Sequence, residues 1–248
     1  MNADAPDTPS DRIYADDAAG GGPFVFSAAV ARVFPDMLRR SIPGYAASIE
    51  AVGSLARRYV TPGSRCYDLG CSLGAATLAM RHGARADGVR IIAADNAPAM
   101  VARCRDIIAA DDAPAAVDVL EADIRDLEIR DASMVVMNYT LQFLPVADRE
   151  RIIRRIAGGM RPGGVFVISE KVVDEDPELE ALLVEMHLDF KRRNAYSELE
   201  ISRKRAAIEN VLIPETVAAH RERLRQAGFA HTAVWLRYFN FVSIVAIK

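Results

Sequence analysis

Short apolar segments alternate with helix-forming segments through the middle of the chain, and this alternation restricts the fold more than any other feature of the sequence. Helical segments at about 98–110 and 146–157 stand between several of the apolar ones. Chains with this pattern form a mostly parallel, twisted sheet with helices on both faces. The apolar segments predict its strands: CYDLG (66–70), VRIIAADN (89–96), VDVLEAD (117–123), SMVVMNY (133–139) and VFVISEK (165–171).

The segments on either side of this α/β body are predicted to be helical or β-rich. Apolar residues recur at helical spacing from 24 to 59, and Pro43 with Gly44 divides that stretch into two helices. Residues 175–226 are charged and mostly helical in pattern, which predicts a helical insertion. The final segment, AVWLRYFNFVSIVAIK, contains two β-rich runs that predict an antiparallel hairpin at the edge of the sheet.

The first 22 residues are rich in Asp, Pro and Gly and show no hydrophobic periodicity. Such a composition is typical of a disordered leader. We therefore expect a leader at 1–22 and a single α/β domain at 23–248, which includes the N-terminal helices, the sheet and the insertion.

Composition argues against several classes of protein. The 248-residue chain is 51% hydrophobic, yet it has no run of the roughly 18 to 20 apolar residues that a membrane span needs. The leader lacks the apolar core of a signal peptide, so we expect a cytoplasmic protein. A formal net charge of −3 gives no overall basic field for nucleic acid and favours a small-molecule substrate. The three cysteines lack metal-site spacing and are expected to be plain thiols.

A glycine-rich loop follows the first predicted strand, in the sequence CYDLGCSLGAATLAM (66–80). Gly70 and Gly74 permit a tight turn and the close approach of a ligand, and the next helix presents free N–H groups. Ligands of such sheets bind beyond the carboxyl ends of the strands. The loop lacks the G-x-G-x-x-G spacing of dinucleotide sites. Its acid-x-G-x-x-x-G spacing is instead typical of enzymes that bind S-adenosylmethionine, although a glycine loop alone is weak evidence.

Acidic residues at the ends of the next two strands support a nucleoside ligand. Asp95 follows Gly70 by 25 residues, near the roughly 20-residue offset at which an acid binds ribose hydroxyls in α/β nucleotide sites. Asp123 and the backbone of Ile124 stand where an adenine edge would lie. Each acid alone is more typical of a helix cap or a solvated loop. Together with the acid of CYDLG, however, Asp95 and Asp123 place acids at the ends of three successive strands, which favours one common site.

These residues carry a specific resemblance. The body resembles the Rossmann-like fold of class I S-adenosylmethionine-dependent methyltransferases. From about residue 33 to the C-terminus, the chain more narrowly resembles the carboxy-S-adenosyl-L-methionine synthase family. The blocks that resemble this family are VFPDMLRRSIPGY, YDLGCSLGAATL, DNAPAM, DIRD, ASMVVMNYTLQFL, SEK, DFKRRNAYSELEIS and KRAAIENVL.

The resemblance implies an unusual reaction. Members of the family convert S-adenosylmethionine and prephenate into carboxy-S-adenosylmethionine and phenylpyruvate. In the family's proposed mechanism, prephenate loses its ring carboxylate as carbon dioxide and its hydroxyl takes a proton from the sulfonium methyl, so no protein base is required. S-adenosylmethionine is thus a substrate, prephenate is the co-substrate, and no metal is expected.

The resemblance also implies partners. The product serves carboxymethylation of wobble uridine (cmo5U) in tRNA by a separate tRNA carboxymethyltransferase. Family members are homodimers, which makes a homodimer the expectation here. We expect no direct binding of nucleic acid and no association with a membrane.

Carried over position by position, the family's ligand contacts fall on ten residues of this chain. Asp95 would bind the ribose, Asp123 and Ile124 the adenine, and Asn138 would lie near the sulfonium. Arg205 would pair with the new carboxylate of the product and is the expected catalytic residue, because a guanidinium binds a carboxylate through two hydrogen bonds. The full set is Tyr45, Gly70, Cys71, Ser72, Asp95, Asn96, Asp123, Ile124, Asn138 and Arg205.

Simpler interpretations remain open for several residues. An arginine in the basic run that contains Arg205 is, taken alone, typical of a solvated helix face. His187 has no second ligand at metal-site spacing and is expected to pack beside the site. Phe239 and Phe241 are expected to pack in an edge strand. Two other functions also remain open: a methyltransferase acting on a small molecule or tRNA, and a non-catalytic S-adenosylmethionine-binding module.

Overall fold

A mostly parallel sheet forms the centre of the computed structural model, which describes residues 9–15, 24–209 and 211–248. The strand order is β3-β2-β1-β4-β5-β8-β7, and the short β6 pairs with β5. The five strands β3, β2, β1, β4 and β5 run parallel to one another, whereas β8 is antiparallel to both β5 and β7. The strands are β1 (Arg65–Leu69), β2 (Arg90–Asp95), β3 (Ala116–Glu121), β4 (Ala132–Asn138), β5 (Met160–Val173), β6 (Glu215–Thr216), β7 (His231–Tyr238) and β8 (Phe241–Ile247).

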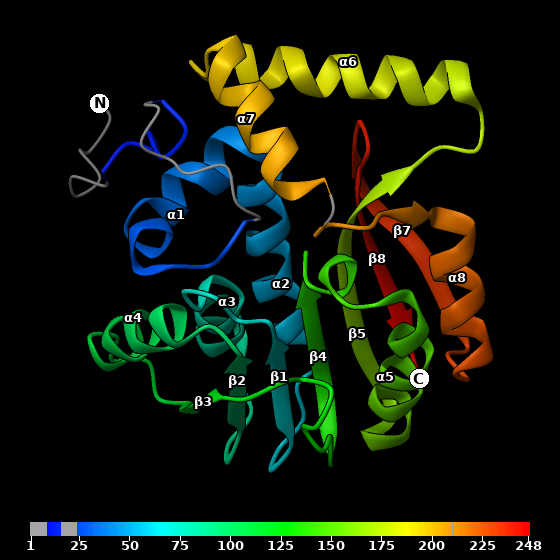
Figure 1. The fold of residues 1–248 in the computed structure, drawn as a ribbon. Coiled ribbons are helices and arrows are strands. Elements are labelled where there is room, and N and C mark those ends of the chain that lie inside the picture. The colour runs from blue at the N-terminus through cyan, green and yellow to red at the C-terminus, as the bar shows by residue number, and fades with distance from the viewer. Residues whose placement is uncertain (1–8, 16–23, 210) are drawn as a thin grey trace.

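Helices cover both faces of this sheet, as the alternating pattern predicts (Figure 1). Helices α2 and α3 pack on the face that carries Cys66 and Ile91, and α5 and α8 pack on the face that carries Tyr67 and Ile92. The helices are α1 (Ala28–Ser41), α2 (Tyr45–Tyr59), α3 (Ala75–Gly83), α4 (Pro98–Ala109), α5 (Val146–Gly159), α6 (Pro177–Arg193), α7 (Glu198–Ile208) and α8 (Val217–Gln226), with a 3-10 turn η1 (Leu141–Phe143).

The central strands are largely buried on both faces, because helices cover each side of the sheet. Met134 and Val136 of β4 join the core under α2 and α3, while Val135 and Met137 join the core under α5 and α8. This explains why the strands are continuous apolar runs and do not alternate with polar residues. The predicted class I methyltransferase fold, with its antiparallel pair at the sheet edge, is confirmed.

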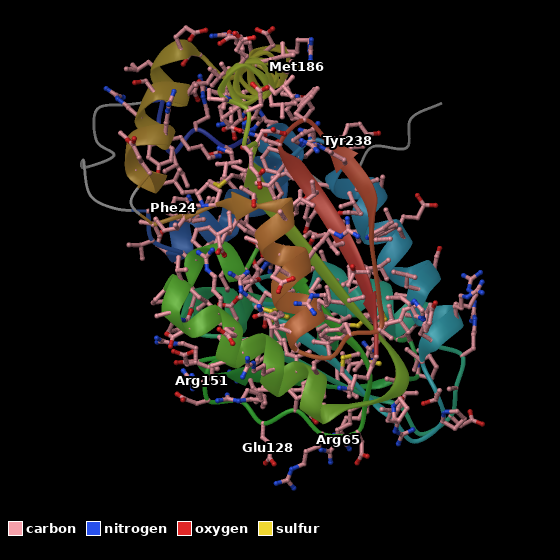
Figure 2. The ribbon with its side chains drawn as sticks, turned by 90° about the vertical axis from the view of Figure 1, so that its right-hand side faces the viewer. Phe24, Arg65, Glu128, Arg151, Met186 and Tyr238 are labelled. Carbon is pink, nitrogen blue, oxygen red and sulfur yellow. The ribbon has the colours of Figure 1, made fainter. Side chains whose placement is uncertain are left out.

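Of the predicted helical insertion, α6 and α7 lie across the carboxyl end of the sheet, whereas α8 packs on one face of the sheet beside α5. Figure 1 shows α6 and α7 on the side toward which β1, β2 and β4 point. Met186 of α6 and Arg65 at the start of β1 lie at opposite ends of the molecule (Figure 2). Helix α1 packs against α6, and a capping box joins Ser197 and Glu200 at the start of α7. These helices therefore form a roof over the strand ends, where ligands of such sheets bind.

Part of the predicted leader is packed against this roof. Asp11 is only 1% exposed, its N–H donates to the Asp36 carboxylate at 2.8 Å, and Tyr196 donates its hydroxyl to the Asp11 side chain. The Arg40 guanidinium donates to the Asp11 carbonyl at 2.9 Å. Residues 9–15 are thus held through one carboxylate and its backbone, whose partners lie far away in sequence. Residues 1–8 and 16–22 of the predicted leader lie outside the described residues.

Two adjacent glycines at the end of α5 test how closely this helix packs against the segment before β4, which contains Ile129. A Cβ at Gly159 would collide with the backbone carbonyl of Ile129, whereas a Cβ at Gly158 would meet nothing within 4 Å. We expect Gly159→Ala to lower the free energy of unfolding by about 1–3 kcal/mol, because backbone atoms must move. Gly158→Ala should leave it unchanged or raise it by up to about 1 kcal/mol. Urea unfolding of both variants measures this, and equal effects would contradict the packing.

Candidate functional site

A cavity of about 530 Å³ lies between the strand ends and the roof helices. Nine of the ten predicted ligand residues line it, and they come from α2 and from the ends of β1, β2, β3 and β4. They are Tyr45, Gly70, Cys71, Ser72, Asp95, Asn96, Asp123, Ile124 and Asn138. The tenth, Arg205, is exposed on α7 and is not part of the lining.

The glycine loop forms the floor of the cavity. The N–H groups of Gly70 and Cys71 both donate to the carbonyl of Ala94, at 2.8 and 3.0 Å, which fastens the loop to the end of β2. Gly70 has a φ of 81°, and a side chain there would collide with Thr140. Gly74, at φ 84°, starts α3 without a side-chain cap. The first N–H groups of α3 thus face a cavity in which a carboxylate would find favourable partners.

Asp95 links this loop to the next one. One carboxylate oxygen accepts the N–H of Ser72 and the other accepts the N–H of Ala97, each at 2.9 Å. Burial raises the pKa of Asp95, while hydrogen bonds from the backbone oppose that rise. Each oxygen still has a lone pair available, so the carboxylate can also accept the two hydroxyl hydrogens of a ribose.

Asp123 lies just beyond the end of β3 and is held by Arg125, which is not among the predicted site residues. The guanidinium of Arg125 contacts its carboxylate at 2.6 Å and also pairs with Asp148 at 3.2 Å. The Arg125 hydrogen bonds keep the pKa of Asp123 below its usual value. Next to it, the Ile124 side chain is buried. Together they offer an ionised acceptor and an apolar surface, as an adenine edge and face require.

Aromatic side chains form one wall of the cavity next to Asn138. Tyr139 has a positive φ of 59°, and its ring lies 6.4 Å from that of Tyr45 and 6.0 Å from that of Phe241. The expectation that Phe241 packs in an edge strand is wrong, because β8 lies between β5 and β7 and begins at the cavity. Tyr139 also lines the cavity but is not among the predicted site residues. Its left-handed backbone conformation cannot be read from the sequence pattern.

Two more buried groups line the cavity. Asp68 accepts a hydrogen bond from the Thr77 hydroxyl at 2.6 Å, and burial raises the pKa of this carboxyl to about 6. His187 has its Nε2 atom 2.9 Å from the carbonyl of Ser41, and burial lowers its pKa to about 3. The imidazole is therefore neutral and donates its Nε2 hydrogen to that carbonyl.

Three lysines outside the predicted set also line the cavity: Lys171, Lys191 and Lys204. They come from β5, α6 and α7 respectively. Arg205 lies close enough that its charge helps to lower the pKa of Lys171 and Lys191. The end of the cavity under the roof is therefore cationic. Among the described residues, no group of three His, Cys, Asp or Glu side chains is arranged to bind a metal, and no helix is long and apolar enough to cross a membrane.

The sheet order, the glycine loop after β1 and the acid after β2 define the class of S-adenosylmethionine-dependent methyltransferase folds. A family model described as "Methyltransferase domain" matches residues 67–164. The structure is also similar to that of human N-acetylserotonin methyltransferase in complex with SAM, with a TM-score of 0.61 and 17% identity over 95% of this chain and 57% of that one. At that identity the likeness shows the fold alone.

Sequence relatives define the family. The chain is 53% identical over 241 residues to the carboxy-S-adenosyl-L-methionine synthase of Aliivibrio fischeri, which covers 97% of this chain and 96% of that one. It is 52% identical over 238 residues to the synthase of the same name from Yersinia enterocolitica, covering 96% and 90%. This chain belongs to the carboxy-S-adenosyl-L-methionine synthase family.

The position of Asp95 gives a prediction about cofactor affinity. Asp95→Ala should weaken binding of S-adenosylmethionine at least about tenfold, because charge-assisted hydrogen bonds to the ribose and the hold on Ser72 are lost together. The protein should stay folded, since no packed apolar side chain is removed. Calorimetric titration measures the affinity and circular dichroism the fold.

Asp118→Ala is a matched control for this variant. Asp118 is a half-exposed acid on β3 that pairs with Arg90 and does not line the cavity. Its removal should leave the affinity unchanged. An Asp95 variant that binds S-adenosylmethionine as tightly as the control would refute the ribose assignment.

Proposed function

We propose that this protein is a carboxy-S-adenosyl-L-methionine synthase, which converts S-adenosylmethionine and prephenate into carboxy-S-adenosylmethionine and phenylpyruvate. The observation that carries the proposal is the identity of 53% over 97% of the chain to a relative of that name. The cavity supports it, because nine residues expected to bind the cofactor lie around one space that continues to a cationic end.

The reaction balances without a reactant beyond these two. Prephenate loses its ring carboxylate as carbon dioxide and its ring hydroxyl as hydroxide, which leaves phenylpyruvate. The hydroxide takes a proton from the sulfonium methyl and becomes water. The ylide carbon that remains forms a bond to carbon dioxide, and the product is a carboxylated sulfonium.

The side chains at the site suit a reaction in which the substrate supplies its own base. His187 is a weak base here, because burial lowers its pKa to about 3 and its Nε2 hydrogen is donated to Ser41. Asp95 and Asp123 already accept hydrogen bonds from the protein. The protein's task is then to place the two substrates together and to keep water out, which the roof helices would do.

We assign roles to the lining residues on this basis. The loop at Gly70, Cys71 and Ser72 and the start of α3 would bind the methionine part, Asp95 the ribose, and Asp123 with Ile124 the adenine. Asn138 and Tyr45 would lie near the sulfonium. Asn96, an exposed residue beside Asp95, would complete the ribose end.

Arg205 would pair with the carboxylate of the product. In one chain it stands outside the lining, so it would enter the site either through a shift of α7 or from a second subunit of the expected homodimer. We further propose that the product passes to a separate tRNA carboxymethyltransferase for wobble uridine (cmo5U) modification. On this proposal the protein itself is cytoplasmic and binds no tRNA.

Incubation of the purified protein with S-adenosylmethionine and prephenate tests the proposal directly. Mass spectrometry should detect a carboxylated sulfonium and an equal amount of phenylpyruvate, because each turnover yields one of each. Labelled cofactor with bulk tRNA and no prephenate should give no labelled tRNA. Methyl transfer in that control would instead indicate a methyltransferase, and binding without turnover of either kind would indicate a non-catalytic module.

Arg205→Ala should change the ratio of two affinities. Binding of carboxy-S-adenosylmethionine should weaken about 30-fold or more, because a carboxylate that loses its charged partner is left uncompensated. Binding of S-adenosylmethionine, which has no carboxylate at that position, should hardly change. Arg205→Lys should be intermediate or poor, since an ammonium keeps the charge and loses the two-pronged geometry. Equal effects on both ligands in calorimetry would exclude the assigned role.

A further inference from the structure

We infer that Lys171 and Lys191 form the subsite for the anionic co-substrate and bind its two carboxylates. The inference rests on the proposed function and adds to it the residues that recognise a small dicarboxylate with an apolar ring. None of these residues belongs to the predicted cofactor site. The three lysines of the cavity differ in whether the protein supplies a counter-ion.

Lys204 has its charge neutralised within the protein. Its ammonium group contacts the Asp11 carboxylate at 3.3 Å and donates to the Ser41 and Tyr196 hydroxyls at 2.9 and 3.2 Å. Asp11, buried in the packed N-terminal segment, is therefore the counter-ion of Lys204. This lysine supports the roof and has little capacity left for a ligand.

Lys171 and Lys191 lack such a partner. Across the described ranges, neither ammonium group has a carboxylate within ion-pair distance or makes a side-chain hydrogen bond. Burial lowers the pKa of Lys171, and the charge of Glu180 on α6 partly opposes this; the Glu180 carboxylate itself accepts the N–H of Asp174 at 2.8 Å. Two lysines from different elements thus line one cavity without a counter-ion among the described residues, an arrangement that an anion from outside would stabilise.

The surroundings of these two lysines add positive charge and apolar surface. Lys204 and Arg205 of α7 both help to lower the pKa of Lys191, and burial is the larger cause, so that this pKa falls to about 7. Burial and Arg205 lower the pKa of Lys171 as well. His187, from the same helix as Lys191, is neutral.

An aromatic surface adjoins the cationic end. The rings of Phe241 and His187 are in edge contact, with centroids 4.7 Å apart, and both line the cavity. The Tyr139 ring packs on Phe241 from the side of the cofactor loop. Ammonium groups beside an aromatic wall suit a molecule that carries carboxylates on an unsaturated ring, and prephenate has this chemistry. The cofactor sulfonium would then face an anion and not two bare cations.

Four substitutions test the inference: Lys171→Met, Lys191→Met, Lys191→Arg and, as a control, Arg193→Met. Arg193 is an exposed cation at the end of α6 and does not line the cavity. Each lysine-to-methionine change should raise the KM for prephenate about 30-fold or more, as loss of one partner of a buried charge pair does. The affinity for S-adenosylmethionine should stay the same or rise, because the change removes a cation that repels the sulfonium. Lys191→Arg should recover part of the loss, and the control should behave as the unaltered protein does.

Two further measurements distinguish a binding role of Lys191 from a purely structural one. They are the thermal stability of the ligand-free variant and the proton uptake that accompanies prephenate binding. Lys191→Met should raise the Tm of the ligand-free protein at pH 8, because burial lowers the pKa of Lys191 to about 7 and folding at any pH below the ordinary lysine pKa of about 10.5 must therefore either release its proton or bury its charge. Binding of prephenate in the presence of S-adenosylhomocysteine should take up protons at pH 8, since the anion restores the charge of Lys191. The binding enthalpy should therefore differ between Tris and phosphate buffers, and Lys191→Met should remove that difference.

The outcomes separate this inference from the proposed function. Normal product formation with an unchanged KM for prephenate in both lysine variants would overturn the inference and leave the function intact. Prephenate that binds to the unaltered protein but gives no carboxylated product would refute the function, while the same variants still decide whether the lysines hold the anion. Weaker binding of S-adenosylmethionine and of prephenate by equal factors would show a structural role and also overturn the inference.

Discussion

The two hydrogen bonds accepted by the Asp95 carboxylate are the constraint on which the rest of the site depends. They hold the N–H groups of Ser72 and Ala97, so one side chain fixes the loops after β1 and β2 relative to each other. Ser72 has a positive φ of 51°, a conformation that needs support from its neighbours in a residue with a Cβ. On the proposed assignment the cofactor's ribose meets the same carboxylate, so the group that shapes the floor of the cavity would also recognise the ligand.

A second buried carboxylate fixes the opposite wall. Glu170, at 1% exposure, accepts the N–H groups of Leu141 and Gln142 at 3.0 and 2.9 Å, and burial raises the pKa of its carboxyl to about 8. The Gln142 side chain in turn accepts the N–H of Lys171 at 2.8 Å. The turn after β4 is thus tied to the end of β5, where Lys171 lies two residues beyond Ser169, the partner of Asn138 in the sheet.

The sequence predicts the half of the site that follows from strand periodicity and fails for the half that follows from packing of the insertion. Gly70, Asp95, Asp123 and Asn138 stand at strand ends, and parallel strands bring their ends to one edge. The charged pattern of α6 does not indicate which side chains turn inward, so Lys191 was missed. The packed Asp11 segment escaped prediction because its partners lie 25 or more residues away.

The distribution of charge in the cavity explains why binding of both substrates together would be more favourable than binding of S-adenosylmethionine alone. S-adenosylmethionine brings a sulfonium to a cavity whose far end already contains Lys171 and Lys191, and like charges in a desolvated space repel. A bound dicarboxylate would relieve that repulsion, so each substrate should favour binding of the other, because coupling between two sites is reciprocal. The same two negative charges survive the proposed reaction, one on phenylpyruvate and one on the carboxylated sulfonium. Each lysine can therefore remain paired with a carboxylate from substrates to products. The carboxyl group moves from the prephenate ring to the ylide carbon while the number of carboxylates beside the lysines stays the same.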